Sequence, residues 1–461
     1  MLQYTEPARP ERALSECSFP SRFRWPPVLL VVRSRLLARS VSATLAGLAF
    51  AGLALLVLAG CRDGASGRPT ASGATATAPA DTPDTAHRAP PPAAAMLDSG
   101  AVALPPEKRR ALVQQDSLWQ KALRVHYRAI VFDGHADTPT LMAEEGYDIG
   151  RRHTPAEAHL DLPRMKEGGL DAVFFSIYVP SYLGEGRRAG VRARRLIRVT
   201  KRQIETYSDR AALATTAEEV RRLARDGKRA VLLGLEGGHA LAASRDTLRA
   251  YARRGVRYVT LTHIGTHSWA DAAGDGPRHG GLSEKGEQLV RAMNDAGVLA
   301  DLSHVSDSTF YDALRVSRAP VILSHSSVRA LTPNERNVTD AMLRALAENG
   351  GLVMINFYDR YVQQAGGGPA ALDDVLDHID HAAQVAGVEH VGLGSDFDGV
   401  PRLPQGLGDA TRLPWLTHGL LKRGYSKEEI YNLLGGNALR VLEEAEEAEE
   451  AASGDSMARV R

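Results

Sequence analysis

The stretch IVFDGHADTP, residues 130–139, sets the pattern from which the fold is predicted. In it a short apolar run ends in a histidine, one spacer residue and an aspartate, His135 and Asp137. An ionisable side chain at the end of a buried strand is costly to desolvate unless it is hydrogen-bonded, paired or bound to a metal ion. Taken alone, these two residues fit an ordinary turn or capping group as well as a functional site.

The same kind of apolar or β-branched run recurs along the chain. Seven more follow the first, at residues 171–179, 230–238, 256–263, 297–304, 319–326, 351–358 and 390–399. Stretches with helical periodicity separate most of them, among them 245–255, 283–297 and 371–387. Strands that are almost wholly apolar and alternate with helices indicate a parallel sheet covered on both faces. The sequence therefore predicts an α/β fold with a (β/α)8 barrel of the TIM type. A doubly wound open sheet is the alternative, weakened because no glycine-rich phosphate loop follows the first strand.

Charge and cysteine content exclude several classes of protein. The chain of 461 residues carries 56 Lys and Arg against 55 Asp and Glu, so its net charge of +1 argues against a nucleic-acid partner. The most basic run, residues 187–202, has helical spacing and predicts an amphipathic helix with a solvated face. The two cysteines, Cys17 and Cys61, both precede the predicted barrel, which excludes a disulfide or a thiolate metal site within it.

The first part of the chain has the composition of an export signal and a linker. Arginines at 33, 35 and 39 precede an apolar run that ends in LAGC at residues 58–61, which resembles the lipidation site of bacterial lipoproteins. An uncleaved membrane anchor is the alternative interpretation, and either one exports the rest of the protein. We therefore expect a membrane-anchored lipoprotein on the periplasmic or cell-surface side, with Cys61 lipidated. Four segments are predicted: a leader (1–60), a flexible tether rich in Ala, Pro and Thr (61–105), the barrel (106–445) and an acidic polar tail (446–461).

Ionisable residues stand at the carboxyl ends of most predicted strands. They are His135, Asp137, Glu236, His263, His304, His325, Asp396 and Asp398. In a parallel barrel these ends form the mouth of the pocket, so the side chains should meet. Histidine nitrogens and carboxylate oxygens are ligands of zinc and similar ions, and one carboxylate can bridge two ions. The sequence thus predicts a binuclear metal site, which suits hydrolysis of amides or esters.

Seven motifs in register resemble the membrane dipeptidases, the renal dipeptidase family. They are DGHADTP, GLEGGHAL, YVTLTHIGTHSWAD, ADLSHVSD, APVILSHSSVRAL, RNV and VGLGSDFDGVP, and the resemblance covers residues 108–445. It implies zinc-dependent hydrolysis of dipeptides by two Zn²⁺ ions, with a small dipeptide as substrate.

The resemblance also implies a ligand set for the two ions. His135 and Asp137 would bind one zinc ion. His304 and His325 would bind the other, and Glu236 would bridge the two. A hydroxide between the ions would attack the scissile amide carbonyl.

Four further residues receive substrate roles from the same resemblance. His263 would contact the substrate and stabilise the tetrahedral intermediate. Arg336 would bind the terminal carboxylate of the dipeptide, a task suited to a planar bidentate donor, and Tyr358 would add a contact to that group. Asp396 would interact with the free amine and relay a proton to the leaving group. A homodimer is a further possibility for such a chain.

Two other functions use the same residues in part. A different binuclear hydrolase acting on lactams, lactones or cyclic amides would share the metal ligands but would not need Arg336. A lipoprotein that only binds metal or peptide would keep the site without turnover.

Overall fold

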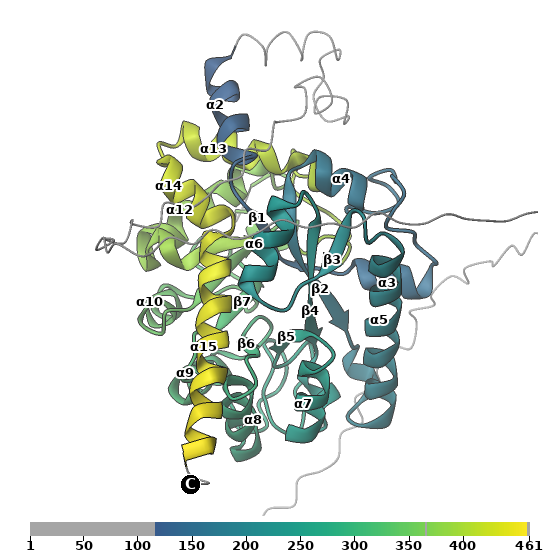
Figure 1. Ribbon diagram of the computed structural model, residues 1–461. Helices are drawn as coiled ribbons and strands as arrows, with labels where there is room; N and C mark the ends of the chain where they lie inside the picture. Colours follow the sequence, from purple (N-terminus) through teal and green to yellow (C-terminus); the bar gives the residue numbers. More distant parts are fainter. Residues whose placement is uncertain (1–115, 365–366, 459–461) are drawn as a thin grey trace, which may run out of the picture. The chain divides into compact units, whose positions relative to one another are not determined.

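The predicted strands form a closed parallel barrel. The computed structural model describes residues 116–364 and 367–458, so the predicted leader, Cys61 and the tether lie outside the described residues. The barrel strands, in spatial order, are β1 (Val131–Ala136), β2 (Leu170–Tyr178), β4 (Arg229–Glu236), β5 (Val256–Thr260), β6 (Leu299–Asp301), β7 (Ile322–Ser326), β8 (Leu352–Asn356) and β9 (Val391–Gly394) (Figure 1). The pairing of β9 with β1 closes the ring. The predicted (β/α)8 barrel is confirmed and the open-sheet alternative is wrong.

One strand was not predicted. The short strand β3 (Ala211–Leu213) pairs in parallel with the first residues of β4, Arg229–Val231. In the barrel β4 lies between β2 and β5, and β5 pairs with it only from Leu233 onward. β3 therefore takes the place of β5 beside the start of β4. Its three residues carry too little apolar pattern to be recognised in the sequence.

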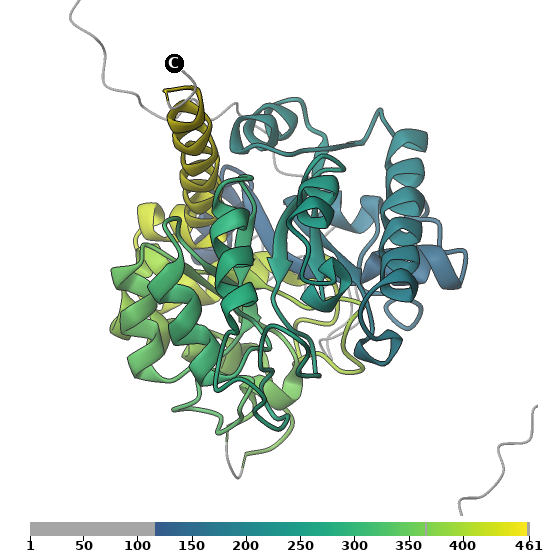
Figure 2. The same ribbon diagram turned by 90° about the horizontal axis from the view of Figure 1, so that it is seen from below.

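Helices surround the strands (Figure 2). Those described are α2 (Ser117–His126), α3 (Thr138–Glu144), α4 (Leu162–Glu167), α5 (Arg187–Thr206), α6 (Ala217–Arg225), α7 (Arg245–Ala252), α8 (Glu284–Asn294), α9 (Asp307–Val316), α10 (Asp340–Glu348), α11 (Asp359–Val362), α12 (Leu372–Ala386), α13 (Leu413–Lys422), α14 (Lys427–Tyr431) and α15 (Asn437–Ala458). The helices predicted at 187–202, 245–255, 283–297 and 371–387 are confirmed as α5, α7, α8 and α12. Within the part of the chain described, no helix has both the length and the apolar character that crossing a bilayer requires.

Local sequence signals set the ends of several helices. The Ser244, Ser283 and Ser306 hydroxyls each accept a hydrogen bond from the backbone N–H three residues later, which caps α7, α8 and α9. Gly387, with φ 97°, directly follows α12 and adopts a backbone conformation that other residues rarely reach. These signals explain why the sequence located the helices well.

The last helix closes the amino-terminal end of the barrel. Buried side chains from the first halves of the strands form one apolar cluster with residues of α6 and α15; they include Phe132, Phe174, Leu232, Leu299, Ile322, Leu352, Val220, Leu223, Leu439 and Leu442. Glu446 Oε1 also accepts a hydrogen bond from the backbone N–H of Ala217, 2.8 Å away in the first turn of α6. The helix α15 therefore continues through the boundary predicted between 445 and 446, and at least one acidic residue of the predicted tail packs against the barrel.

Buried His126 should make the stability of the fold depend on pH. Its Nδ1 lies 2.8 Å from Thr417 Oγ1 and its Nε2 lies 2.8 Å from the carbonyl of Gly168. Burial lowers the pKa of His126 from 6.5 to about 4, despite the opposing effect of the bond to Gly168. Between these values the unfolded chain binds a proton that the native protein does not, so the free energy of unfolding falls as the pH falls from 6.5 towards 4.

We expect His126 to account for a loss of about 2 kcal/mol between about pH 7 and pH 5. Urea unfolding of the metal-free protein at both pH values, for the wild type and His126→Gln, measures it. The variant should lose less stability over this interval than the wild type. Equal losses in the two proteins would show that His126 is protonated in the native state at pH 5.

Candidate metal centre

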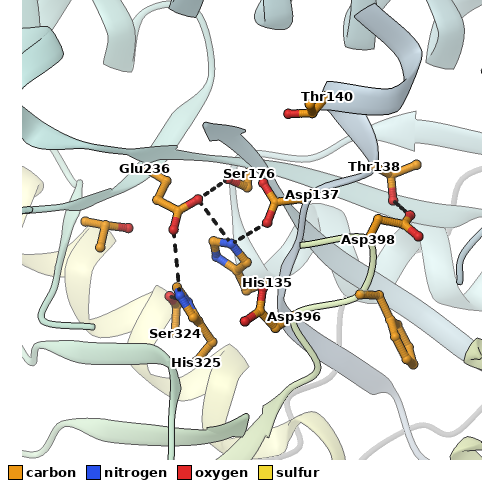
Figure 3. A network of polar contacts seen from close by, with 12 residues as sticks. His135, Asp137, Thr138, Thr140, Ser176, Glu236, Ser324, His325, Asp396 and Asp398 are labelled. Carbon is orange, nitrogen blue, oxygen red and sulfur yellow. Dashed lines mark hydrogen bonds and ion pairs between the residues drawn. The ribbon is translucent and has the colours of Figure 1, made fainter. Parts of the chain in front are cut away.

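The carboxyl ends of the barrel strands bring the predicted metal ligands together, and Figure 3 shows four of them, His135, Asp137, Glu236 and His325. His135 lies near the end of β1, Glu236 is the last residue of β4, and His325 lies in β7. Asp137 directly follows β1, and His304 follows β6. All five are buried, and the four other than His135 line a pocket of about 330 Å³.

The backbone is irregular where it presents these ligands. The pairing of β1 with β2 shifts register between Asp133 and Ala136, and that of β7 with β8 shifts between Leu323 and Ser326. Each shift spans a predicted histidine ligand, and such irregularities re-aim side chains at barrel rims. His304 has a left-handed backbone, with φ 70°, which is uncommon for residues other than glycine.

Glu236 lies between two pairs of side chains, a His–Asp pair and a His–His pair. Its Oε2 is 3.4 Å from His135 Nε2, which is also 3.3 Å from Asp137 Oδ2. Its Oε1 is 3.3 Å from His304 Nε2 and 3.7 Å from His325 Nε2. The Nε2 atoms of His304 and His325 are only 2.9 Å apart. One carboxylate thus faces a His–Asp pair with one oxygen and a His–His pair with the other.

The donor atoms fit divalent metal ions. His135 Nε2 and Asp137 Oδ1 are buried without a hydrogen bond of good geometry, which is costly unless another partner is present. His135, Glu236 and His325 form one group whose ligand atoms lie within 4.8 Å of one another; Glu236, His263 and His304 form another, and His135, Asp137 and Asp396 a third. Neutral imidazoles and carboxylates at such spacing are typical of zinc sites. The shared members of these groups are consistent with a binuclear centre.

At three of the proposed ligands, electrostatics favour the protonation state that a metal ion requires. Burial lowers the pKa of His304 and of His325 well below 6.5, and the charge of Arg336 acts in the same direction on both. Both rings are therefore neutral and retain a lone pair. Burial alone would raise the pKa of Glu236, but His135 and hydrogen bonds from His135 and His304 hold it well below its usual range. Glu236 is accordingly a carboxylate.

The predicted substrate residues surround the same pocket. His263, Arg336, Tyr358 and Asp396 all line it. The Arg336 guanidinium donates to the carbonyl of His325 over 3.2 Å and to Ser326 Oγ over 3.3 Å, while its Nε is buried without a partner. Of the four histidines at the strand ends, His263 has the most exposed side chain, at 16%. These positions match the predicted substrate contacts, whose roles remain predictions.

The two aspartates that follow β9, Asp396 and Asp398, have different hydrogen-bond partners. Asn356 donates a hydrogen bond to Asp396 Oδ2 over 3.0 Å, and burial, the largest effect, raises the pKa of Asp396 to about 6. Asp398 instead accepts hydrogen bonds from Thr138 Oγ1 and from the backbone N–H of His159, both over 2.6 Å. It lines the pocket but belongs to none of the three ligand groups in the described chain.

Several polar residues of the site were not predicted. Ser176, inside strand β2, donates to Glu236 Oε2 over 2.7 Å. Tyr178 and Tyr361 line the pocket beside Tyr358. Hydroxyl residues within an apolar strand are common, so the sequence gives only a weak signal for Ser176 and Tyr178, and Tyr361 lies in the short helix α11, away from any predicted strand end.

Several known proteins with similar sequences or structures are dipeptidases or metallo peptidases. The family model described as membrane dipeptidase (peptidase family M19) matches residues 119–456. The dipeptidase tcpJ of Claviceps purpurea (strain 20.1) is 40% identical over 327 residues, which is 68% of this chain and 77% of that protein. The dipeptidase verJ of Clonostachys rogersoniana is 39% identical over 345 residues, 72% of this chain and 88% of that protein. A crystal structure of a metallo peptidase from Rhodobacter sphaeroides, liganded with a phosphinate mimic of the dipeptide L-Ala-D-Ala, has a TM-score of 0.64 and 31% identity, and covers 69% of this chain and 99% of that one.

Replacing Glu236 by Gln should weaken metal binding at both pairs of side chains. The amide keeps the shape of the side chain but removes its charge and one of its two acceptor oxygens. We expect zinc bound per chain, measured by atomic emission after dialysis, to fall from two ions towards none. Asp398→Asn is the matched control, because Asp398 lines the pocket outside the three ligand groups, and it should bind zinc like the wild type. Full zinc content in Glu236→Gln would exclude Glu236 as a ligand.

Proposed function

The chain belongs to the membrane dipeptidase family, peptidase family M19, and is a metallo-dipeptidase; we propose that it hydrolyses dipeptides with two zinc ions held by the residues around Glu236. The observation that carries this proposal is the position of Glu236, with one oxygen 3.4 Å from His135 Nε2 and the other 3.3 Å from His304 Nε2. A carboxylate so placed can bridge two ions, one on each side.

The proposed ligand set divides the site between the two ions. His135 and Asp137 would hold one ion, His304 and His325 would hold the other, and Glu236 would be shared between them. When bound, such a pair of ions supplies a nucleophile from water at neutral pH and polarises the scissile carbonyl.

The remaining residues bind and orient the dipeptide. Arg336 holds the terminal carboxylate, with Tyr358 beside it. His263 donates a hydrogen bond to the oxygen that becomes negatively charged in the transition state. Asp396, fixed by Asn356, holds the free amine and passes a proton to the departing nitrogen. The dipeptide mimic in the Rhodobacter sphaeroides structure supports an occupant of this size and chemistry.

We also propose that the protein is exported and held at a membrane by a lipid on Cys61. The support is the apolar run and the LAGC sequence that ends at that cysteine, followed by the Ala-, Pro- and Thr-rich segment. Metabolic labelling with a fatty acid, compared between the wild type and Cys61→Ala, tests this.

A free amine should be required for turnover. Zinc-loaded protein should hydrolyse an unmodified dipeptide and should cleave the N-acetylated dipeptide at least about 100-fold more slowly, because the blocked amine leaves Asp396 buried without its partner. His304→Ala should abolish activity towards both while the circular dichroism spectrum is retained. Equal cleavage of the blocked and free peptides, or preference for a cyclic amide, would favour another binuclear hydrolase. Two bound zinc ions without hydrolysis of any dipeptide would favour a binding protein.

Arg336 should determine the preference for a free carboxyl terminus. For the wild type, kcat/KM should be higher for a dipeptide than for its C-terminal amide, because only the carboxylate can accept a bidentate pair from the guanidinium. Arg336→Ala should lower kcat/KM for the free dipeptide by about 100-fold or more and largely remove the preference. A preference of the same size in Arg336→Ala would place the carboxylate elsewhere in the pocket.

A further inference from the structure

Two of the proposed histidine ligands each have a buried hydroxyl against the ring nitrogen that faces away from the ions. His135 Nδ1 lies 2.7 Å from the hydroxyl of Tyr258, and His325 Nδ1 lies 2.8 Å from Ser324 Oγ. In both rings it is Nε2 that faces Glu236. A histidine ligand binds through a nitrogen with a lone pair, so the partner of its other nitrogen decides tautomer and ring orientation.

The contacts of Ser324 fix the direction of its hydrogen bonds. Ser324 Oγ and Thr260 Oγ1 both lie 2.6 Å from Asp301 Oδ2. Asp301 Oδ1 accepts from the backbone N–H groups of Ser303, over 3.0 Å, and of Ser324, over 2.9 Å. A carboxylate with four such neighbours acts only as an acceptor, so the single Ser324 hydroxyl proton points at Asp301. Ser324 Oγ is then left to accept the Nδ1–H of His325, and His325 Nε2 carries the lone pair.

Packing fixes the ring of Tyr258. This tyrosine is fully buried in the barrel, and its ring occupies the space next to Gly234. A Cβ on Gly234 would lie only 1.9 Å from Tyr258 Cζ, so no larger residue fits at 234 without moving the ring. The phenol oxygen is therefore held in place against His135 Nδ1, while His135 Nε2 faces Asp137 and Glu236.

The third proposed histidine ligand lacks this support. His304 Nδ1 is buried and has no hydrogen-bond partner among the described residues. The hydroxyl contacts are thus specific to His135 and His325, which are proposed to serve different ions. One ligand of each ion is held by a hydroxyl group.

We propose that Tyr258 and Ser324 are positioning residues of the metal centre, each holding one histidine ligand with Nε2 free for its ion, and that Asp301 orients Ser324. This inference rests on the proposed function, since it assumes that zinc is bound where the ligands converge. Neither residue lines the pocket or belongs to the ligand groups of the described chain. Their effect should therefore appear as a loss of metal affinity, separate from any loss of fold.

The experiment compares variants that remove one oxygen each, in the full chain. Ser324→Ala removes the hydroxyl between Asp301 and His325. Thr260→Val is its matched control, because it removes the other 2.6 Å donor to the same Asp301 oxygen without touching a histidine. Tyr258→Phe removes the hydroxyl from His135, and its control Tyr147→Phe removes a buried hydroxyl that donates to the Leu160 carbonyl over 2.7 Å.

The readouts are zinc affinity, by competition with a chelator of known affinity, and thermal unfolding of the metal-free proteins. Ser324→Ala and Tyr258→Phe should each lower the affinity for one of the two zinc ions by about 10- to 100-fold. Each control should lose about as much stability as the variant with which it is matched. It should bind both zinc ions with the affinities of the wild type. If Ser324→Ala does not fold, the pair Tyr258→Phe and Tyr147→Phe decides the question.

The possible results separate the two proposals. Wild-type protein that binds fewer than two zinc ions would overturn the proposed binuclear site itself. Two tightly bound ions in the wild type, with unchanged affinities in Ser324→Ala and Tyr258→Phe, would overturn only the positioning role. Equal losses of affinity in a variant and its control would also overturn it, because the effect would then come from lost stability.

Discussion

The buried charge of Glu236 is the constraint on which the mouth of this barrel depends. A buried carboxylate loses its hydration and needs polar partners that compensate for this loss. The partners of Glu236 among the described residues are imidazoles and a hydroxyl. The same burial keeps His304 and His325 neutral, whereas the pKa of His135 lies well above 6.5 despite its burial, because Tyr258 and Glu236 are close to it. Asp137 adds a second carboxylate beside His135. Divalent cations between these groups would stabilise the arrangement, which is consistent with a binuclear metal centre.

The barrel separates what stabilises the fold from what does the chemistry. At the amino-terminal end of the strands, apolar residues of α6 and α15 meet those of the barrel interior, and Glu446 holds the start of α6. At the carboxyl-terminal end, polar residues replace the apolar ones. The carboxyl ends of parallel barrel strands all lie on one side, so residues more than 100 positions apart, such as His135 and Glu236, become neighbours.

The sequence predicted those parts of the molecule that depend on repetition. Eight apolar runs located the barrel strands, and the residues expected at the mouth other than His135 line the pocket there, because each lies at or just after a strand end. Features that depend on a single contact were not predictable. Nothing in AAL at 211–213 distinguishes the strand β3 from a loop, and nothing in the SDFD sequence shows that Asp398 binds Thr138 and His159. The contact that holds Glu446 against α6 is made with Ala217, more than 200 positions earlier.

The hydroxyl groups behind the histidines and the left-handed backbone of His304 address the same physical problem in different ways. A ligand must be held in one orientation before the ion arrives, or the ion has to order it on binding. His135 and His325 come from strands and receive side-chain support from Tyr258 and Ser324. His304 follows its strand with φ 70°, a conformation that costs on the order of 1–3 kcal/mol and persists only where its surroundings enforce it. The surroundings of His304 therefore hold its main chain in place, whereas its Nδ1 has no hydrogen-bond partner among the described residues.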